Sequence, residues 1–253
     1  MRKFTTTIYM LLLMMTCMAQ SGNMADIRKK IADINNKLPL SIDSNCTIDK
    51  LAVEDDCVVQ YGTCSSTFDQ NGKSLNRTWG ESFLEQGKNE EVRVMYQEYM
   101  SAGLGVKQIM RFKDSGKTAS NTFTVSDLGR MMSFPAEAYS VLLNEIRTAR
   151  KSLPFAAGAG IMCVAYEFSR EDMIMCFDVD EDFYSMDDLQ DNVSSTKNRM
   201  LSQIADRTSK SLLMARICVN AGYGMGLCYV GKTSGKKAEV IMKYQELKTC
   251  FDD

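Results

Sequence analysis

Ala102-Gly-Leu-Gly-Val and Phe112-Lys-Asp-Ser-Gly-Lys are matched, without a gap, by Ala221-Gly-Tyr-Gly-Met and Gly231-Lys-Thr-Ser-Gly-Lys. Each residue of the later copy lies 119 positions after its counterpart, as position 221 does after position 102. Upstream, Leu38-Pro39 recurs as Leu153-Pro154 at an offset of 115. A repeat at nearly constant spacing predicts one structural unit that occurs twice in the chain.

Hydrophobic spacing predicts the same order of elements in both copies. Apolar residues from Met24 to Lys37 follow the period of a helix, which Leu38-Pro39 must end because the residue before a proline avoids helical geometry. The expected elements are helix 24–37, strands 47–53 and 57–64, helix 89–101 and strands 107–113 and 118–126, then helix 136–152, strands 161–168 and 172–179, helix 196–219 and strands 226–231 and 239–247.

This order predicts the fold class. It is α+β, with two tandem duplicated units that each read helix-strand-strand-helix-strand-strand. We expect both helices to pack on one face of a four-stranded antiparallel sheet in each unit. The expected domains are a first repeat at 20–130 and a second repeat at 131–253.

Residues 1–19 predict a signal peptide, with Arg2-Lys3 before a short apolar run and Cys17-Met-Ala19 at the cleavage site. The apolar run is shorter than the roughly 20 residues that span a bilayer, so no transmembrane segment is expected in the mature chain. We expect an exported protein, periplasmic or extracellular. Lipidation of Cys17, which would tether the chain to a membrane, is the alternative, although the residues before it match a lipoprotein cleavage box poorly.

Charge and motifs argue against several ligands. The formal net charge is −2, and removing residues 1–19 takes away Arg2 and Lys3, which leaves −4 and no basic field for nucleic acid. The stretch Gly226 to Thr233 formally matches a phosphate loop, but its apolar interior predicts a hairpin strand, so no nucleotide is expected. The acidic run from Asp178 lacks the glycine and glutamate of a calcium-binding loop, so no cofactor or metal site is expected.

The chain has no histidine, which excludes catalysis by Ser-His or Cys-His pairs. Carboxylate-pair chemistry and Ser-Lys chemistry remain, yet the acids fall mostly in turns and on polar helix faces. We therefore expect a protein that is not an enzyme.

Eight cysteines follow residue 19, an even number that suggests disulfides in an exported chain. Pairing across the two expected hairpins predicts the bridges Cys46–Cys64 and Cys163–Cys176. The alternative is that the cysteines are buried and free, since the two repeats do not share cysteine positions.

Together these features predict an exported, non-catalytic module that binds a protein, peptide or glycan at a cell envelope. The alternatives are a carboxylate-dependent hydrolase and a structural or storage protein. A hydrolase would need two acids in one cleft and a raised pKa for at least one of them.

Overall fold

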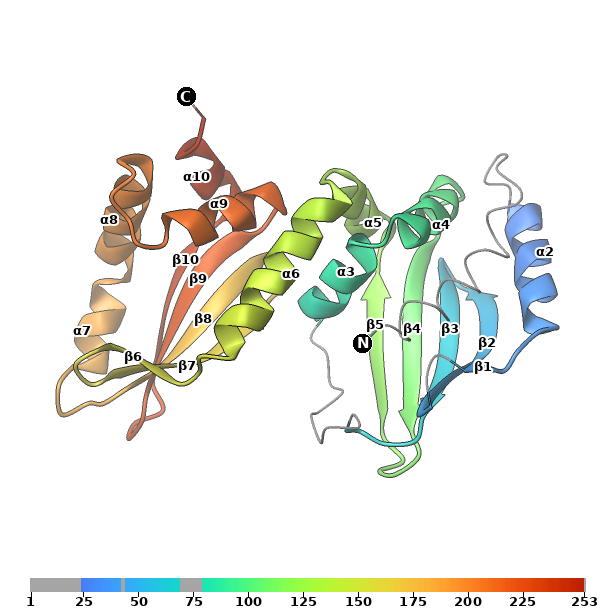
Figure 1. The fold of residues 1–253 in the computed structure, drawn as a ribbon, viewed down its shortest axis with the longest axis horizontal. Helices are drawn as coiled ribbons and strands as arrows, with labels where there is room; N and C mark the ends of the chain where they lie inside the picture. The colour runs from blue at the N-terminus through green and yellow to red at the C-terminus, as the bar shows by residue number, and fades with distance from the viewer. Residues whose placement is uncertain (1–23, 42–43, 69–78, 253) are drawn as a thin grey trace. The chain divides into compact units, whose positions relative to one another are not determined.

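The structure is a computed structural model that describes residues 24–41, 44–68 and 79–252. The chain divides into two compact units, Met1–Ser133 and Phe134–Asp253, and each combines helices with a five-stranded sheet (Figure 1). The predicted α+β class with two units is confirmed. The predicted signal peptide, Cys17 included, lies outside the described residues.

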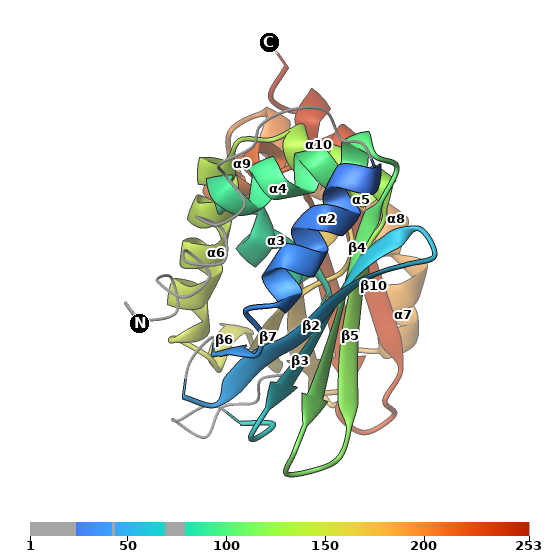
Figure 2. The same ribbon diagram turned by 90° about the vertical axis from the view of Figure 1, so that its right-hand side faces the viewer.

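The first unit has a sheet in the order β1-β2-β3-β4-β5, with helices on one face of it. Its elements are α2 (Met24–Asn35), β1 (Leu40–Ser41), β2 (Cys46–Glu54), β3 (Cys57–Cys64), α3 (Trp79–Gly87), α4 (Glu90–Ser101), β4 (Gly105–Phe112), β5 (Thr118–Phe123) and α5 (Val125–Met132). Helix α2 packs against β2 (Figure 2), and its buried residues are Ile27, Ile31 and Ile34. These three residues are one helical turn apart, which is the amphipathic spacing of the sequence.

The second unit has a sheet in the order β10-β9-β8-β7-β6. Its elements are α6 (Ala136–Arg150), β6 (Phe155–Gly158), β7 (Ile161–Phe168), β8 (Asp172–Val179), α7 (Met186–Asp191), α8 (Val193–Ala205), α9 (Leu212–Asn220), β9 (Gly224–Gly231), β10 (Lys237–Met242) and α10 (Tyr244–Thr249). The fully buried Met173, Met225 and Met242 lie side by side across β8, β9 and β10.

Both sheets are antiparallel except for one pair of strands in each. Strands β3 and β4 run parallel, as do β8 and β9, and the helices between them form the crossover that parallel strands require. Each sheet also gains a short edge strand, β1 or β6, so it has five strands instead of the four predicted.

The helices differ from the prediction in three places. Helix α3 lies between the expected strand 57–64 and the expected helix 89–101, where no element was predicted, and the helix expected at 196–219 is divided into α8 and α9. The predicted closing strands end early, at Phe123 and Met242, and short helices follow each of them. Helix α5 begins directly after β5 because Thr124 and Asp127 form a reciprocal capping box, which satisfies free backbone N–H groups at the helix start.

Several local features recur at corresponding positions of the two units. Gly103 and Gly222 both have positive φ, at 74° and 72°, where a helix ends and β4 or β9 follows. At the free edge of β2, the Asn35 carboxamide accepts a hydrogen bond from the backbone N–H of Leu51 and donates one to its C=O, both at 2.8 Å. Arg150, the counterpart of Asn35, donates to the C=O of Tyr166 at 2.7 Å in the same place on β7.

Candidate functional site

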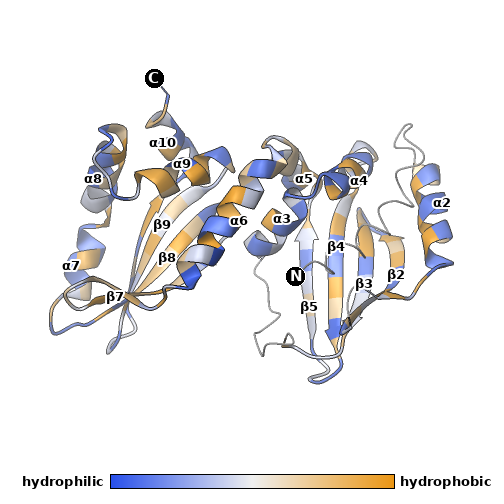
Figure 3. Ribbon diagram, in the orientation of Figure 1, coloured by the Kyte–Doolittle hydropathy of each residue, from blue (hydrophilic) through white to orange (hydrophobic). Residues whose placement is uncertain are grey.

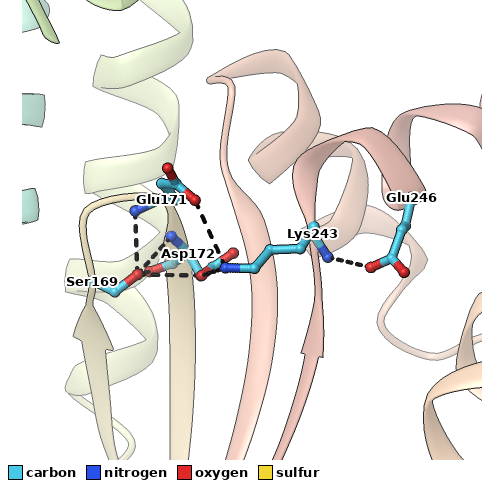
Figure 4. Close-up of polar contacts among 5 residues, drawn as sticks. All are labelled: Ser169, Glu171, Asp172, Lys243 and Glu246. Carbon is cyan, nitrogen blue, oxygen red and sulfur yellow. Dashed lines mark hydrogen bonds and ion pairs between the residues drawn. The ribbon is translucent and has the colours of Figure 1, made fainter. Parts of the chain in front are cut away.

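A polar cluster lies at one end of the second sheet, where the turn before β8 meets the residue between β10 and α10 (Figure 4). Asp172 is the first residue of β8 and only 5% exposed. The Lys243 ammonium lies 2.8 Å from Asp172 Oδ2 and 3.7 Å from a carboxylate oxygen of Glu171. A buried carboxylate on the central strand is therefore paired with a cation from the end of the edge strand β10.

Backbone hydrogen bonds fix both partners. Ser169 Oγ accepts from the N–H groups of Glu171 and Asp172, at 3.2 and 2.9 Å, which closes the turn before β8. Glu246 accepts from the N–H of Lys243 at 2.8 Å, which holds Lys243 at the start of α10. The two side chains thus meet because two turns place them together.

The surroundings of Lys243 favour its charged form. The hydrogen bond to Asp172 is the largest cause that raises the pKa of Lys243 above its ordinary value, so the ammonium stays protonated at neutral pH. A protonated lysine cannot act as the base of a Ser-Lys pair. Cys218 is fully buried nearby, and burial, followed by the charge of Asp172, raises the pKa of its thiol to about 12.

The second carboxylate oxygen, Asp172 Oδ1, has no hydrogen-bond partner among the described residues. It lies against the backbone of Gly224, where an added Cβ would be 2.3 Å from Oδ1. No room for a ligand atom remains on that side. The corresponding residues of the first unit are Cys57 and Thr124, so the ion pair belongs to the second unit alone.

A second polar feature, here called the amide row, crosses the first sheet. It consists of Gln60 on β3, Gln108 on β4 and Asn121 on β5, which the strand register places side by side. The Gln108 carboxamide donates to Gln60 Oε1 at 3.4 Å, and all three side chains are half-buried.

The amide row lies on the face of the sheet that carries the helices. Asn121 shares this face with Phe123, whose ring packs edge-on against Trp79 and Phe83 of α3 at 5.2 and 5.8 Å. Trp79 is also held by its ring nitrogen, which donates to the C=O of Thr122 at 2.7 Å. A fixed aromatic cluster therefore borders a row of amide donors and acceptors.

The second unit has apolar residues in the same row. Met175, Leu227 and Val240 are adjacent in its register at the positions that correspond to the amide row. Figure 3 shows the contrast, since β8 and β9 are mainly orange whereas β5 is white to pale blue. The row is therefore polar in the first unit and apolar in the second, and this surface was not among the predicted sites.

Of the two predicted disulfides, the structure contains one. Cys46 and Cys64 are opposite each other on β2 and β3 and form a disulfide. Cys163 and Cys176 are free thiols, contrary to the predicted bridge. The turn lies one residue later than expected and a β-bulge follows Cys163, so the register pairs Cys163 with Phe177 and Cys176 with Ala165.

The stretch that resembles a phosphate loop forms β9 and the turn of the β9–β10 hairpin. The Glu181 carboxylate accepts from the N–H groups of Thr233 and Ser234 at 2.7 and 2.8 Å, so a side chain of the protein occupies the donors of this turn. The shifted carboxyl pKa values among the described residues, those of Asp114, Glu181 and Glu246, are all lowered by hydrogen bonds. A catalytic acid needs the opposite shift.

Within residues 24–41, 44–68 and 79–252, no three side chains of the metal-binding types are grouped so that they could hold an ion. In the same part of the chain, every helix is too short or too polar to span a bilayer.

Comparison with known proteins identifies no family. No protein-family model matches the sequence, and no curated protein is similar to it. One solved structure with a detectable likeness is that of a "putative secreted protein" from Pseudomonas aeruginosa, at 11% identity and a TM-score of 0.36, covering 44% of this chain and 93% of that one. A likeness at this level assigns neither a family nor a function to the chain.

Proposed function

We propose that this chain is an exported, non-catalytic module that binds a protein, peptide or glycan at a cell envelope, and that the amide row is its contact surface. The observation that carries the proposal is the row of three amides, Gln60, Gln108 and Asn121, at positions that are apolar in the second unit. Amides offer both donors and acceptors, which suits the backbone of a peptide or the hydroxyl groups of a sugar.

The disulfide supports export. Cys46 and Cys64 are joined across β2 and β3. Disulfides persist in oxidising compartments outside the cytosol, in agreement with the leader predicted at residues 1–19. The proposal includes three alternative locations for the chain: periplasmic, extracellular, or tethered to a membrane through Cys17.

We also infer that the two units arose by duplication, as the gapless sequence match predicts. The strands β2 and β3 begin 115 residues before β7 and β8, and β4 and β5 begin 119 residues before β9 and β10. The paired glycines and the paired edge contacts of Asn35 and Arg150 support this inference. Duplication makes the second unit an internal reference for the first.

A double variant tests the contact surface. Gln108→Leu with Asn121→Val introduces the residues of the second unit into the amide row. We expect it to weaken binding to the best ligand from peptide and glycan arrays about tenfold or more, because lost hydrogen bonds cost about 1 kcal/mol each. Calorimetric titration of wild type and variant measures the change.

Ser120→Ala is the matched control, because Ser120 lies on the same strand and the opposite face. Its affinity should equal that of the wild type, and urea unfolding should show that both variants are folded. Equal affinity for the double variant and the wild type would show that the amide row is not the contact surface. A wild-type chain that retains nothing from either array would instead contradict the binding function.

A further inference from the structure

Two thiols of the second sheet are direct neighbours. Cys176 on β8 and Cys228 on β9 are partners in the register of the central parallel pair. Adjacent strands lie about 4.8 Å apart. This spacing is within the Cα separation of about 4.4–6.8 Å that a disulfide accepts.

Both thiols lie on the face of the sheet that points away from the helices. Side chains alternate along a strand, and the helix-facing positions next to Cys176 are occupied by Met175 and Phe177, the latter stacked on Tyr229 at 5.2 Å. Cys228 has the same orientation as Cys176 because the two are paired in parallel strands. Its Sγ lies 3.7 Å from a carboxylate oxygen of Glu239 on β10.

Among the described residues of the second unit, no other cysteine competes for this position. Cys163 is paired with Phe177, so it faces the helices, and it is fully buried. Cys218 lies in α9, and Cys250 follows α10. Cys176 therefore has one register partner among the free thiols, which is Cys228.

We propose that Cys176 and Cys228 form a second disulfide of the chain, by exchange with a small-molecule or protein disulfide. The thiolate of one cysteine attacks the oxidant, forms a mixed disulfide and releases the first thiol of the oxidant. The thiolate of the other cysteine then attacks the protein sulfur of this mixed disulfide and releases the second thiol. The protein loses two hydrogens, and the oxidant is reduced to two thiols.

The surroundings slow this reaction at neutral pH. Burial is the largest cause that raises the pKa of Cys176, to about 12, and it also raises the pKa of Cys228. The groups around the pair are Glu167 and Cys163 on β7 and Glu239 and Lys237 on β10, of which only Lys237 lowers the pKa values. Because the thiolate is the reactive form, oxidation should be faster at higher pH.

The test is peptide mapping of the wild-type chain after incubation with oxidised glutathione, near pH 8.5 and again near pH 7, followed by alkylation and non-reducing digestion. We expect a cross-linked peptide that joins Cys176 and Cys228, formed faster at the higher pH. The Cys46–Cys64 peptide is the internal reference in the same digest. Cys176→Ser and Cys228→Ser should each abolish the new cross-link.

Cys163→Ser is the matched control, and the Cys176–Cys228 cross-link should form in it as in the wild type. A cross-link between Cys163 and Cys176 would overturn the proposal. So would wild-type protein in which Cys176 and Cys228 carry only glutathione or only the alkylating reagent. Because these readouts come from the wild-type chain, an unfolded variant would leave the test valid.

Discussion

Gly224→Ala is expected to lower the free energy of unfolding of the second unit by about 3 kcal/mol. A Cβ at this position would lie 2.3 Å from Asp172 Oδ1 and 2.7 Å from the C=O of Met242. The Asp172 carboxylate is held by its ion pair with Lys243, and the C=O of Met242 belongs to the backbone at the end of β10, so the carbonyl cannot withdraw without a shift of the backbone. Urea unfolding, followed by circular dichroism, measures the loss.

The corresponding glycine of the first unit, Gly105, allows a second test of the same steric clash. A Cβ at Gly105 would lie 2.6 Å from the C=O of Phe123, so Gly105→Ala should also destabilise its unit. Gly129→Ala is the control: Gly129 lies in α5, and its nearest neighbour would be Met100 Sδ at 3.8 Å. It should raise stability by about 0.5–1 kcal/mol, as alanine does in a helix. Gly224→Ala and Gly129→Ala proteins of equal stability would contradict the close approach described for β9.

For strands with strong hydrophobic periodicity, both the first and the last residue could be predicted from the sequence. The ranges 57–64, 161–168 and 172–179 agree with β3, β7 and β8, because turn residues and apolar runs mark both ends. The parallel pairing of β3 with β4 could not be predicted, since periodicity describes one strand and says nothing of its neighbour. For the same reason the β-bulge after Cys163, which changes its partner, was not visible.

The missed helices had a local signal. Thr124 and Asp127 have the spacing of a capping box, and this signal was hidden in a run that also alternates like a strand. Lys243 and Glu246 repeat the spacing at the start of α10. Short helices of this kind depend on capping and on tertiary packing more than on their own hydrophobic pattern.

The two polar features differ in how far the sequence could have shown them. The amide row becomes visible once the repeats are aligned, because Gln60 then corresponds to Met175 and Gln108 to Leu227. The ion pair joins Asp172 to Lys243, which are 71 residues apart. Only the strand order places these two at the same end of the sheet, so a sequence pattern could not identify the pair.

A double-mutant cycle on this ion pair should show that Lys243 stabilises the buried Asp172 carboxylate. Lys243→Thr removes the cation from the buried Asp172 carboxylate and should lower the free energy of unfolding by about 1–2 kcal/mol at neutral pH. The loss should be smaller than for a fully buried pair, because the Lys243 side chain is 53% exposed and water can replace part of its contribution.

The first unit supplies the compensating change. Asp172→Cys together with Lys243→Thr introduces the residues found at the corresponding positions, Cys57 and Thr124. The double variant should be more stable than the two single losses would predict, by about 1 kcal/mol of coupling, because no carboxylate then remains buried without its cation. Additive losses would show that Lys243 does not stabilise Asp172.

The cycle should also depend on pH in a defined direction. The pKa of Lys243 is raised in the folded chain by its hydrogen bond to Asp172, so the stabilisation is complete below the pKa of lysine in the unfolded chain, about 10.4. It is lost as the pH rises through the higher folded value, because the neutral amine no longer pairs with the carboxylate. The stability difference between the wild type and Lys243→Thr should therefore be constant from neutral pH to about pH 9 and should decrease above about pH 10.5. A difference that decreased instead between neutral pH and about pH 9 would assign the stabilisation to a group other than Lys243.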